Sequence, residues 1–118
     1  MTDALVKIRE TALELPETEE RLSHGQPTFF VGGKQFAQFR DNHHGDGKTV
    51  VCVRVSGLDE QAMLLEADPE TYSKPAYMPS WLSINVAGNA VDWDHVADRI
   101  ATSWELAAPR RLLEAGGR

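Results

Sequence analysis

Thr28-Phe29-Phe30-Val31-Gly32-Gly33 begins the most informative stretch of the sequence, which continues as Lys34-Gln35-Phe36-Ala37-Gln38-Phe39-Arg40. Both halves contain the aromatic and β-branched residues that favour strands. The two glycines between them suit a tight turn, because such turns need positive φ angles that glycine adopts at little cost. The stretch therefore predicts a β-hairpin with strands at residues 28–31 and 34–40.

Further strands are predicted on both sides of this hairpin. Residues 48–55 contain four valines and are apolar on nearly both faces, which predicts a central strand. Residues 81–87 alternate, with Leu82, Ile84 and Val86 on one side, which predicts a strand with one buried face. Residues 21–23 are expected to form a short edge strand, and residues 70–80 give no clear assignment.

Three helices are predicted from apolar spacing, over residues 3–15, 58–67 and 92–108. Prolines follow all three, and Asp92 suits the N-cap of the last helix. Ser56 and Asp59 resemble a capping box for the second helix. The resulting order, α-β-β-β-β-α-β-α, predicts one α+β domain over residues 1–118, with an antiparallel sheet and the N- and C-terminal helices packed on it.

The composition is that of an ordinary globular domain. Hydrophobic residues make up 42% of the chain, charged residues 25%, and the net charge is −6. A single cysteine, Cys52, cannot form an intramolecular disulfide, and the N-terminus lacks the pattern of a signal peptide. No apolar run approaches the roughly 20 residues needed to span a bilayer. We therefore expect a cytoplasmic protein that does not insert into membranes.

Positive charge is concentrated in the middle of the chain. Residues 21–54 contain five basic and two acidic residues, a net charge of +3, which leaves −9 for the rest. Basic side chains on strands can contact DNA phosphates without reading the bases. This hypothesis of nucleic-acid binding involves Arg21, Lys34, Arg40, His43, His44, Lys48 and Arg54. The alternative is that these are solvated strand positions that protect the sheet edges.

A second hypothesis places a ligand or a protein partner elsewhere. Lys74, Tyr77 and Trp81 combine a cation with aromatic rings and can line a small-molecule cleft, and the acidic first helix can face a basic protein partner. Trp81 begins a strand after a proline, so we expect it to be partly exposed at the rim of the sheet. Trp93 and Trp104 fall on the apolar stripe of the last helix and are expected in the core.

The sequence contains no pattern specific for catalysis or for a metal. His43 and His44 lack a second pair of ligands, and Ser23-His24 lies in no nucleophile motif. Cys52 lies within an apolar strand, where a packing role is expected. We therefore predict no catalytic residue, no metal and no cofactor, and hence a non-enzymatic binding module.

Several motifs together resemble the MmcQ/YjbR family. They are Leu15-Pro16-Glu17-Thr18-Glu19-Glu20, Ser23-His24-Gly25-Gln26-Pro27-Thr28-Phe29, Val31-Gly32-Gly33-Lys34-Gln35-Phe36-Ala37, Ser80-Trp81-Leu82-Ser83-Ile84, Val91-Asp92-Trp93 and Ser103-Trp104-Glu105-Leu106-Ala107-Ala108-Pro109. The resemblance covers nearly the whole chain and implies a compact α+β fold similar to the CyaY-like (frataxin-like) arrangement. It also implies DNA binding through a double wing of β-hairpins, and it supplies no catalytic residues.

Overall fold

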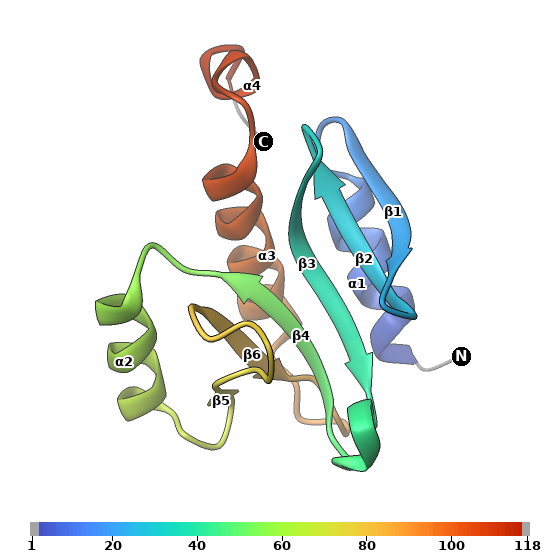
Figure 1. The fold of residues 1–118 in the computed structure, drawn as a ribbon, viewed down its shortest axis with the longest axis vertical. Coiled ribbons are helices and arrows are strands. Elements are labelled where there is room, and N and C mark those ends of the chain that lie inside the picture. The colour runs from blue at the N-terminus through green and yellow to red at the C-terminus, as the bar shows by residue number, and fades with distance from the viewer. Residues whose placement is uncertain (1–2, 117–118) are drawn as a thin grey trace.

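The structure, a computed structural model, describes residues 3–116 (Figure 1). Its helices are α1 (Asp3–Leu13), α2 (Leu58–Ala67), α3 (Trp93–Ala107) and α4 (Arg110–Glu114), with a single 3-10 turn, η1 (His43–Gly45), among the described residues. The strands are β1 (Thr18–Ser23), β2 (Gln26–Val31), β3 (Lys34–Asp41), β4 (Thr49–Arg54), β5 (Tyr72–Ser73) and β6 (Trp81–Asn85). The predicted α+β class is confirmed.

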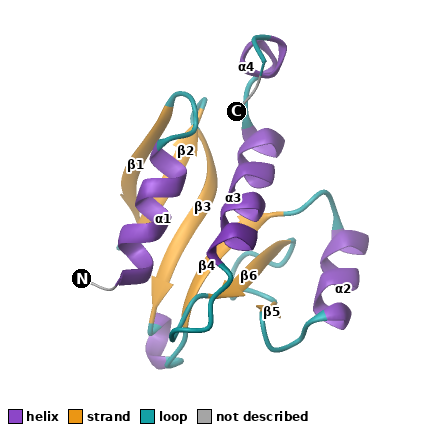
Figure 2. Ribbon diagram, turned by 180° about the vertical axis from the view of Figure 1, so that it is seen from behind, coloured by secondary structure: helices purple, strands orange, loops and turns teal. Residues whose placement is uncertain are grey.

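All six strands form one antiparallel sheet in the order β1-β2-β3-β4-β6-β5. The predicted hairpin forms strands β2 and β3, the second and third in this order, and Gly32 and Gly33 have the expected positive φ angles of 58° and 80°. The valine-rich strand β4 lies between β3 and β6, so its predicted central position is confirmed. Helices α1 and α3 cover one face of the sheet, whereas α2 lies beside the β5 end (Figure 2).

The main core lies between the sheet and these two helices. Ile8 and Ala12 from α1, and Ile100 and Trp104 from α3, are fully buried against the inward side chains of the strands. The Trp104 indole Nε1 donates a hydrogen bond to the Pro16 carbonyl oxygen at 3.0 Å, which ties α3 to the segment that follows α1. The sequence placed Trp104 in the core correctly, while Trp93 is only partly buried.

A β-bulge in β3 connects the sheet directly to α3. Phe29 pairs with Ala37 and Phe30 with Gln35, so Phe36 is an extra residue, and both Phe36 and Ala37 are buried in the helix-side core. The Ser103 hydroxyl donates to the Phe36 carbonyl oxygen at 2.6 Å and accepts from the Arg54 backbone N–H at 2.8 Å. A side chain of α3 thus satisfies one backbone group of the bulged strand β3 and one of the neighbouring strand β4.

We expect Ser103→Ala to lower the free energy of unfolding by about 2–3 kcal/mol, because two buried backbone groups would lose their partner. Chemical denaturation followed by circular dichroism measures this loss. Thr102→Ala, on the same helix and only half-buried, is the matched control and should change stability by less than about 0.5 kcal/mol. Equal effects of the two substitutions would show that Ser103 does not support the bulge.

The opposite face of the sheet is partly covered by residues 74–80. Gln61 of α2 donates from Nε2 to the carbonyl oxygens of Pro79 and Trp81, at 2.8 and 2.6 Å, and so holds this segment against the sheet. Trp81 is only 8% exposed, which corrects the prediction that it is partly exposed at the sheet rim. Its ring is covered by the Arg54 guanidinium, 4.9 Å from the ring centroid, and by Met78.

Several predicted boundaries differ from the structure. The first edge strand, β1, has six residues rather than three, and α1 ends at Leu13 rather than at residue 15. Strand β5 and helix α4 were not predicted. The expected capping box also differs, since Gly57 is the N-cap of α2 and the Ser56 N–H donates to Glu60 Oε1 at 2.7 Å rather than pairing with Asp59. Asp92 caps α3 as predicted.

Candidate functional site: a histidine-lined pocket

A pocket opens on the sheet face that the helices leave uncovered. Its volume is about 420 Å³, within the range typical of small-molecule sites. The lining residues come from the β1–β2 turn, strands β2 and β3, the η1 turn and the segment 74–80. We call it the histidine pocket and define it by His24, Gln26, Gln38, Arg40, His43, His44 and Tyr77. This lining contains no acidic side chain.

Arg40 is the only arginine or lysine that lines the histidine pocket, and it is 6% exposed. Its Nε donates to Gln38 Oε1 at 2.9 Å, and its Nη1 donates to the Ala76 carbonyl oxygen at 2.9 Å. These bonds use two of the five N–H groups of the guanidinium. Among residues 3–116, Arg40 has no carboxylate within ion-pair distance. A buried cation normally has a counter-charge, so this one is positioned to receive an anion.

His43 provides a second donor in the same wall. The Gln26 side-chain amide nitrogen lies 3.3 Å from Nδ1 of His43, so Nδ1 accepts this hydrogen bond and the neutral ring carries its hydrogen on Nε2. Nε2 is enclosed and has no hydrogen-bond partner in the structure. Burial is the main cause that lowers the pKa of His43 from its ordinary value of 6.5, and the nearby charges of His44 and Arg40 lower it further. An anion in the pocket would satisfy Nε2 and favour the charged ring.

Backbone strain is concentrated around the same pocket. Five non-glycine residues among 3–116 have positive φ angles, and three of them line it: His24 (52°), His44 (52°) and Tyr77 (65°). Left-handed backbone costs such residues roughly 1–2 kcal/mol each. Strain of this kind persists where the surrounding structure imposes it and is frequent at functional sites. The strained positions therefore point independently to the histidine pocket.

A smaller pocket of about 210 Å³ adjoins the histidine pocket and shares Arg40, His43, His44 and Tyr77 with it. It adds the exposed Lys48 and Lys74, together with Asp46. Asp46 accepts a hydrogen bond from the Lys48 backbone N–H at 2.8 Å and so shapes the loop before β4. Two lysines and one carboxylate give this adjoining pocket a cationic lining in a protein whose net charge is −6.

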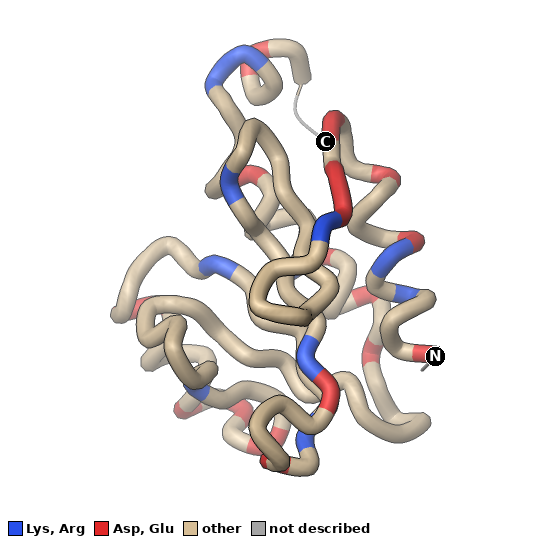
Figure 3. Tube along the Cα trace, turned by 45° about the vertical axis from the view of Figure 1, so that its right-hand side comes forward, with Lys and Arg blue, Asp and Glu red and all other residues tan. Residues whose placement is uncertain are grey.

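The structure brings together only part of the predicted sites. Arg40, His43, His44 and Lys48, from the nucleic-acid hypothesis, meet Lys74 and Tyr77, from the ligand hypothesis, in the two adjoining pockets. The other predicted residues lie apart. Arg21 covers the Phe30 ring at 4.1 Å, Lys34 begins β3 at the opposite end from η1, and Arg54 and Trp81 line a separate pocket. Basic and acidic positions are interspersed along the trace rather than separated into a basic and an acidic half (Figure 3).

Three pocket residues were not predicted as ligand-binding residues, namely His24, Gln26 and Gln38. Gln38 is 4% exposed and uses both ends of its amide, accepting from Arg40 Nε and donating to Thr28 Oγ1 at 3.0 Å. The only available signal was the placement of Gln38 and Arg40 at alternate positions of β3, on either side of Phe39. Cys52 is fully buried, as predicted, and burial raises the pKa of its thiol.

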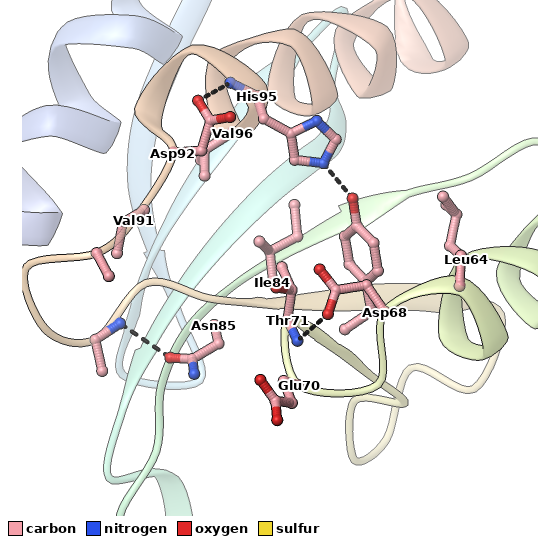
Figure 4. A pocket seen from close by; sticks show the side chains of 14 residues that line it. Leu64, Asp68, Glu70, Thr71, Ile84, Asn85, Val91, Asp92, His95 and Val96 are labelled. Atoms are coloured by element: carbon pink, nitrogen blue, oxygen red, sulfur yellow. Dashed lines mark hydrogen bonds between the residues drawn. The ribbon is translucent and has the colours of Figure 1, made fainter.

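A larger cleft, of about 620 Å³, lies between the end of α2, β5 and the start of α3 (Figure 4). Several of its polar side chains are engaged with one another or with nearby backbone. The Tyr72 hydroxyl and His95 Nε2 are hydrogen-bonded, Asp92 accepts from the His95 N–H, and Asp68 accepts from the Thr71 N–H. Burial raises the pKa of Tyr72, so its phenol stays protonated near neutral pH. These contacts serve local structure, and the histidine pocket is the stronger candidate.

The described residues set limits on other kinds of site. Within residues 3–116, no group of three or more His, Cys, Asp or Glu side chains is arranged to hold a metal ion. In the same range, no helix has the length and apolar character required to cross a membrane.

These features define a class of protein: a small α+β domain with one antiparallel sheet, two helices on one face and a pocket on the other. The chain belongs to the YjbR family, whose model matches residues 13–106. The crystal structure of Deinococcus radiodurans protein DR2400, a DUF419 domain, has the same fold, with a TM-score of 0.75 and 16% identity over 97% of this chain and 88% of that one. No curated protein matches the sequence.

Proposed function

We propose that this protein is a non-enzymatic binding module that holds a phosphate-bearing ligand in the histidine pocket. The observation that carries the proposal is the buried Arg40 guanidinium, which lines the pocket and has no carboxylate partner among residues 3–116. The unpartnered Nε2 of His43 and the two lysines of the adjoining pocket support it. Arginine forms paired hydrogen bonds with phosphate oxygens, which suits an anion of this class.

Duplex DNA, the ligand implied by the family resemblance, is a less favourable fit to this geometry. A duplex backbone is contacted through exposed cations that share one face. Only four of the seven residues of the nucleic-acid hypothesis lie in the two adjoining pockets, and the most buried of them, Arg40, lines a pocket rather than an exposed surface. Fluorescence anisotropy of a labelled duplex at low and at physiological salt tests this alternative directly.

The pH dependence of sulfate binding tests the proposal, because sulfate stays a dianion between pH 5 and 8. The pKa of His43 is lowered in the free protein, and a bound dianion would raise it. Binding therefore takes up a proton, and affinity should rise as the pH falls, by at most about tenfold per unit for each proton. His24 and His44 line the same pocket, and Asp46, which lines the adjoining one, acts to raise the pKa of His43.

NMR titrations that follow the histidine rings at constant ionic strength measure this effect residue by residue. His43→Gln, which keeps a polar group but cannot take up a proton, should bind sulfate with a weaker pH dependence. His95→Gln, in the separate cleft, should behave like the wild type. A sulfate titration that moves no ring of the histidine pocket at any pH would overturn the proposal. Salt-sensitive duplex binding without competition from sulfate would favour DNA at another surface.

A further inference from the structure

We infer that the phosphate-bearing ligand is a nucleotide, whose base stacks on Tyr77 while its phosphate binds Arg40. This inference rests on the proposed function and adds the chemical class of the organic part. It is carried by the ring of Tyr77, by its fixed relation to Arg40, and by the hydrogen bonds already formed in the pocket wall.

Tyr77 lines the pocket but is 80% exposed, an unusual state for a large aromatic side chain. The His43 and His44 rings contact it at centroid distances of 6.3 and 5.6 Å and interplanar angles of 82° and 74°. Neither imidazole is therefore stacked face to face on the phenol ring. No other aromatic ring among the described residues contacts it. A planar base would supply that stacked contact, as bases do on aromatic side chains in other proteins.

The ring and the guanidinium are held in a fixed relation to each other. Arg40 Nη1 donates to the carbonyl oxygen of Ala76, which immediately precedes Tyr77. The left-handed φ of 65° at Tyr77 further defines where the ring leaves the segment 74–80. Cation and ring therefore lie in one cavity of about 420 Å³, which accommodates a phosphate and a planar base together.

Two amide side chains of the pocket wall are already engaged in internal hydrogen bonds. Both ends of the Gln38 amide are used, and the Gln26 amide nitrogen bonds to His43. Recognition would then depend on stacking area rather than on base-edge hydrogen bonds. We expect purine nucleotides to bind more tightly than pyrimidine nucleotides, with little difference between adenine and guanine.

The experiment compares three probes, adenosine 5′-monophosphate, ribose 5-phosphate and sulfate, by calorimetry on the wild type, Tyr77→Ala and Tyr77→Phe. The wild type should bind the nucleotide about tenfold more tightly than the sugar phosphate. Tyr77→Ala should bind the nucleotide and the sugar phosphate with equal affinity, whereas Tyr77→Phe should retain the preference for the nucleotide. Because Tyr77 is 80% exposed, both variants should fold, and circular dichroism checks this.

Equal affinity of the wild type for the nucleotide and the sugar phosphate would overturn the inference while sulfate binding still supports the proposed function. A nucleotide preference that survives in Tyr77→Ala would overturn it as well. Absence of sulfate binding would instead refute the proposed function on which it rests, and the inference with it. A 5′-phosphorylated dinucleotide that binds as tightly as the mononucleotide would support the stacked site. It would identify the 5′ end of a nucleic-acid strand as the source of the ligand.

Discussion

Trp104→Ala is expected to lower the free energy of unfolding by about 3–5 kcal/mol, the range found when a fully buried aromatic side chain is truncated. Trp104 is completely buried and packs in the core between α3, α1 and the sheet. Its removal leaves a large cavity and also removes the partner of the Pro16 carbonyl oxygen. Since domains of this size are stable by only about 5–15 kcal/mol, the variant should be close to unfolding.

Two further variants separate the contributions to this loss. Trp104→Phe keeps much of the apolar volume but loses the hydrogen bond to Pro16, and should cost about 1–3 kcal/mol. Trp93→Ala removes the same side chain from a partly buried position on the same helix and should cost less than Trp104→Ala. Urea denaturation followed by circular dichroism measures all three. If the two alanine variants lost equal stability, the core could not be centred on Trp104.

The parts of the fold that the sequence predicted well are those in which local pattern and tertiary environment agree. The Gly32-Gly33 turn needs only positive φ angles, and the valines of β4 are apolar in every context. Strand β1 was underestimated because Glu19 and Glu20 suit a helix or a loop equally well, and only pairing with β2 makes residues 18–20 a strand. Strand β5 has two residues, too few to give a periodic signal.

The candidate site was predicted only in part, because the burial of its polar strand residues depends on a segment that is distant in the sequence. Alternation along β3 places Gln38 and Arg40 on the face away from the helices, where charged residues normally meet solvent. They are buried because the segment 74–80, held by Gln61, returns over that face. No local pattern in residues 34–40 predicts this contact with the segment 74–80. For the same reason, the sequence did not show that Arg40, His43, His44 and Lys48 of one hypothesis meet Lys74 and Tyr77 of the other in two adjoining pockets.

Arg40→Gln is expected to weaken the binding of sulfate and of phosphomonoesters by about 2–3 kcal/mol, or roughly 30- to 150-fold, because the pocket would lose its permanent cation and its charged hydrogen bonds. Arg54→Gln is the matched control. Arg54 is a half-buried arginine on the same face of the sheet, its Nε donates to the Gln35 carbonyl oxygen at 2.8 Å, and it lines a different pocket. Its substitution should leave sulfate affinity unchanged.

Arg40 also supports the fold through its bonds to Gln38 and Ala76, so a loss of binding alone does not separate the two roles. A ligand that binds only the folded state raises its stability in proportion to the logarithm of ligand concentration over Kd. Sulfate should therefore raise the melting temperature of the wild type and of Arg54→Gln at pH 6, relative to chloride of equal ionic strength, and should do so far less for Arg40→Gln. If sulfate stabilised Arg40→Gln as strongly as the wild type, Arg40 would be a structural residue only, and the histidine pocket would no longer qualify as an anion site.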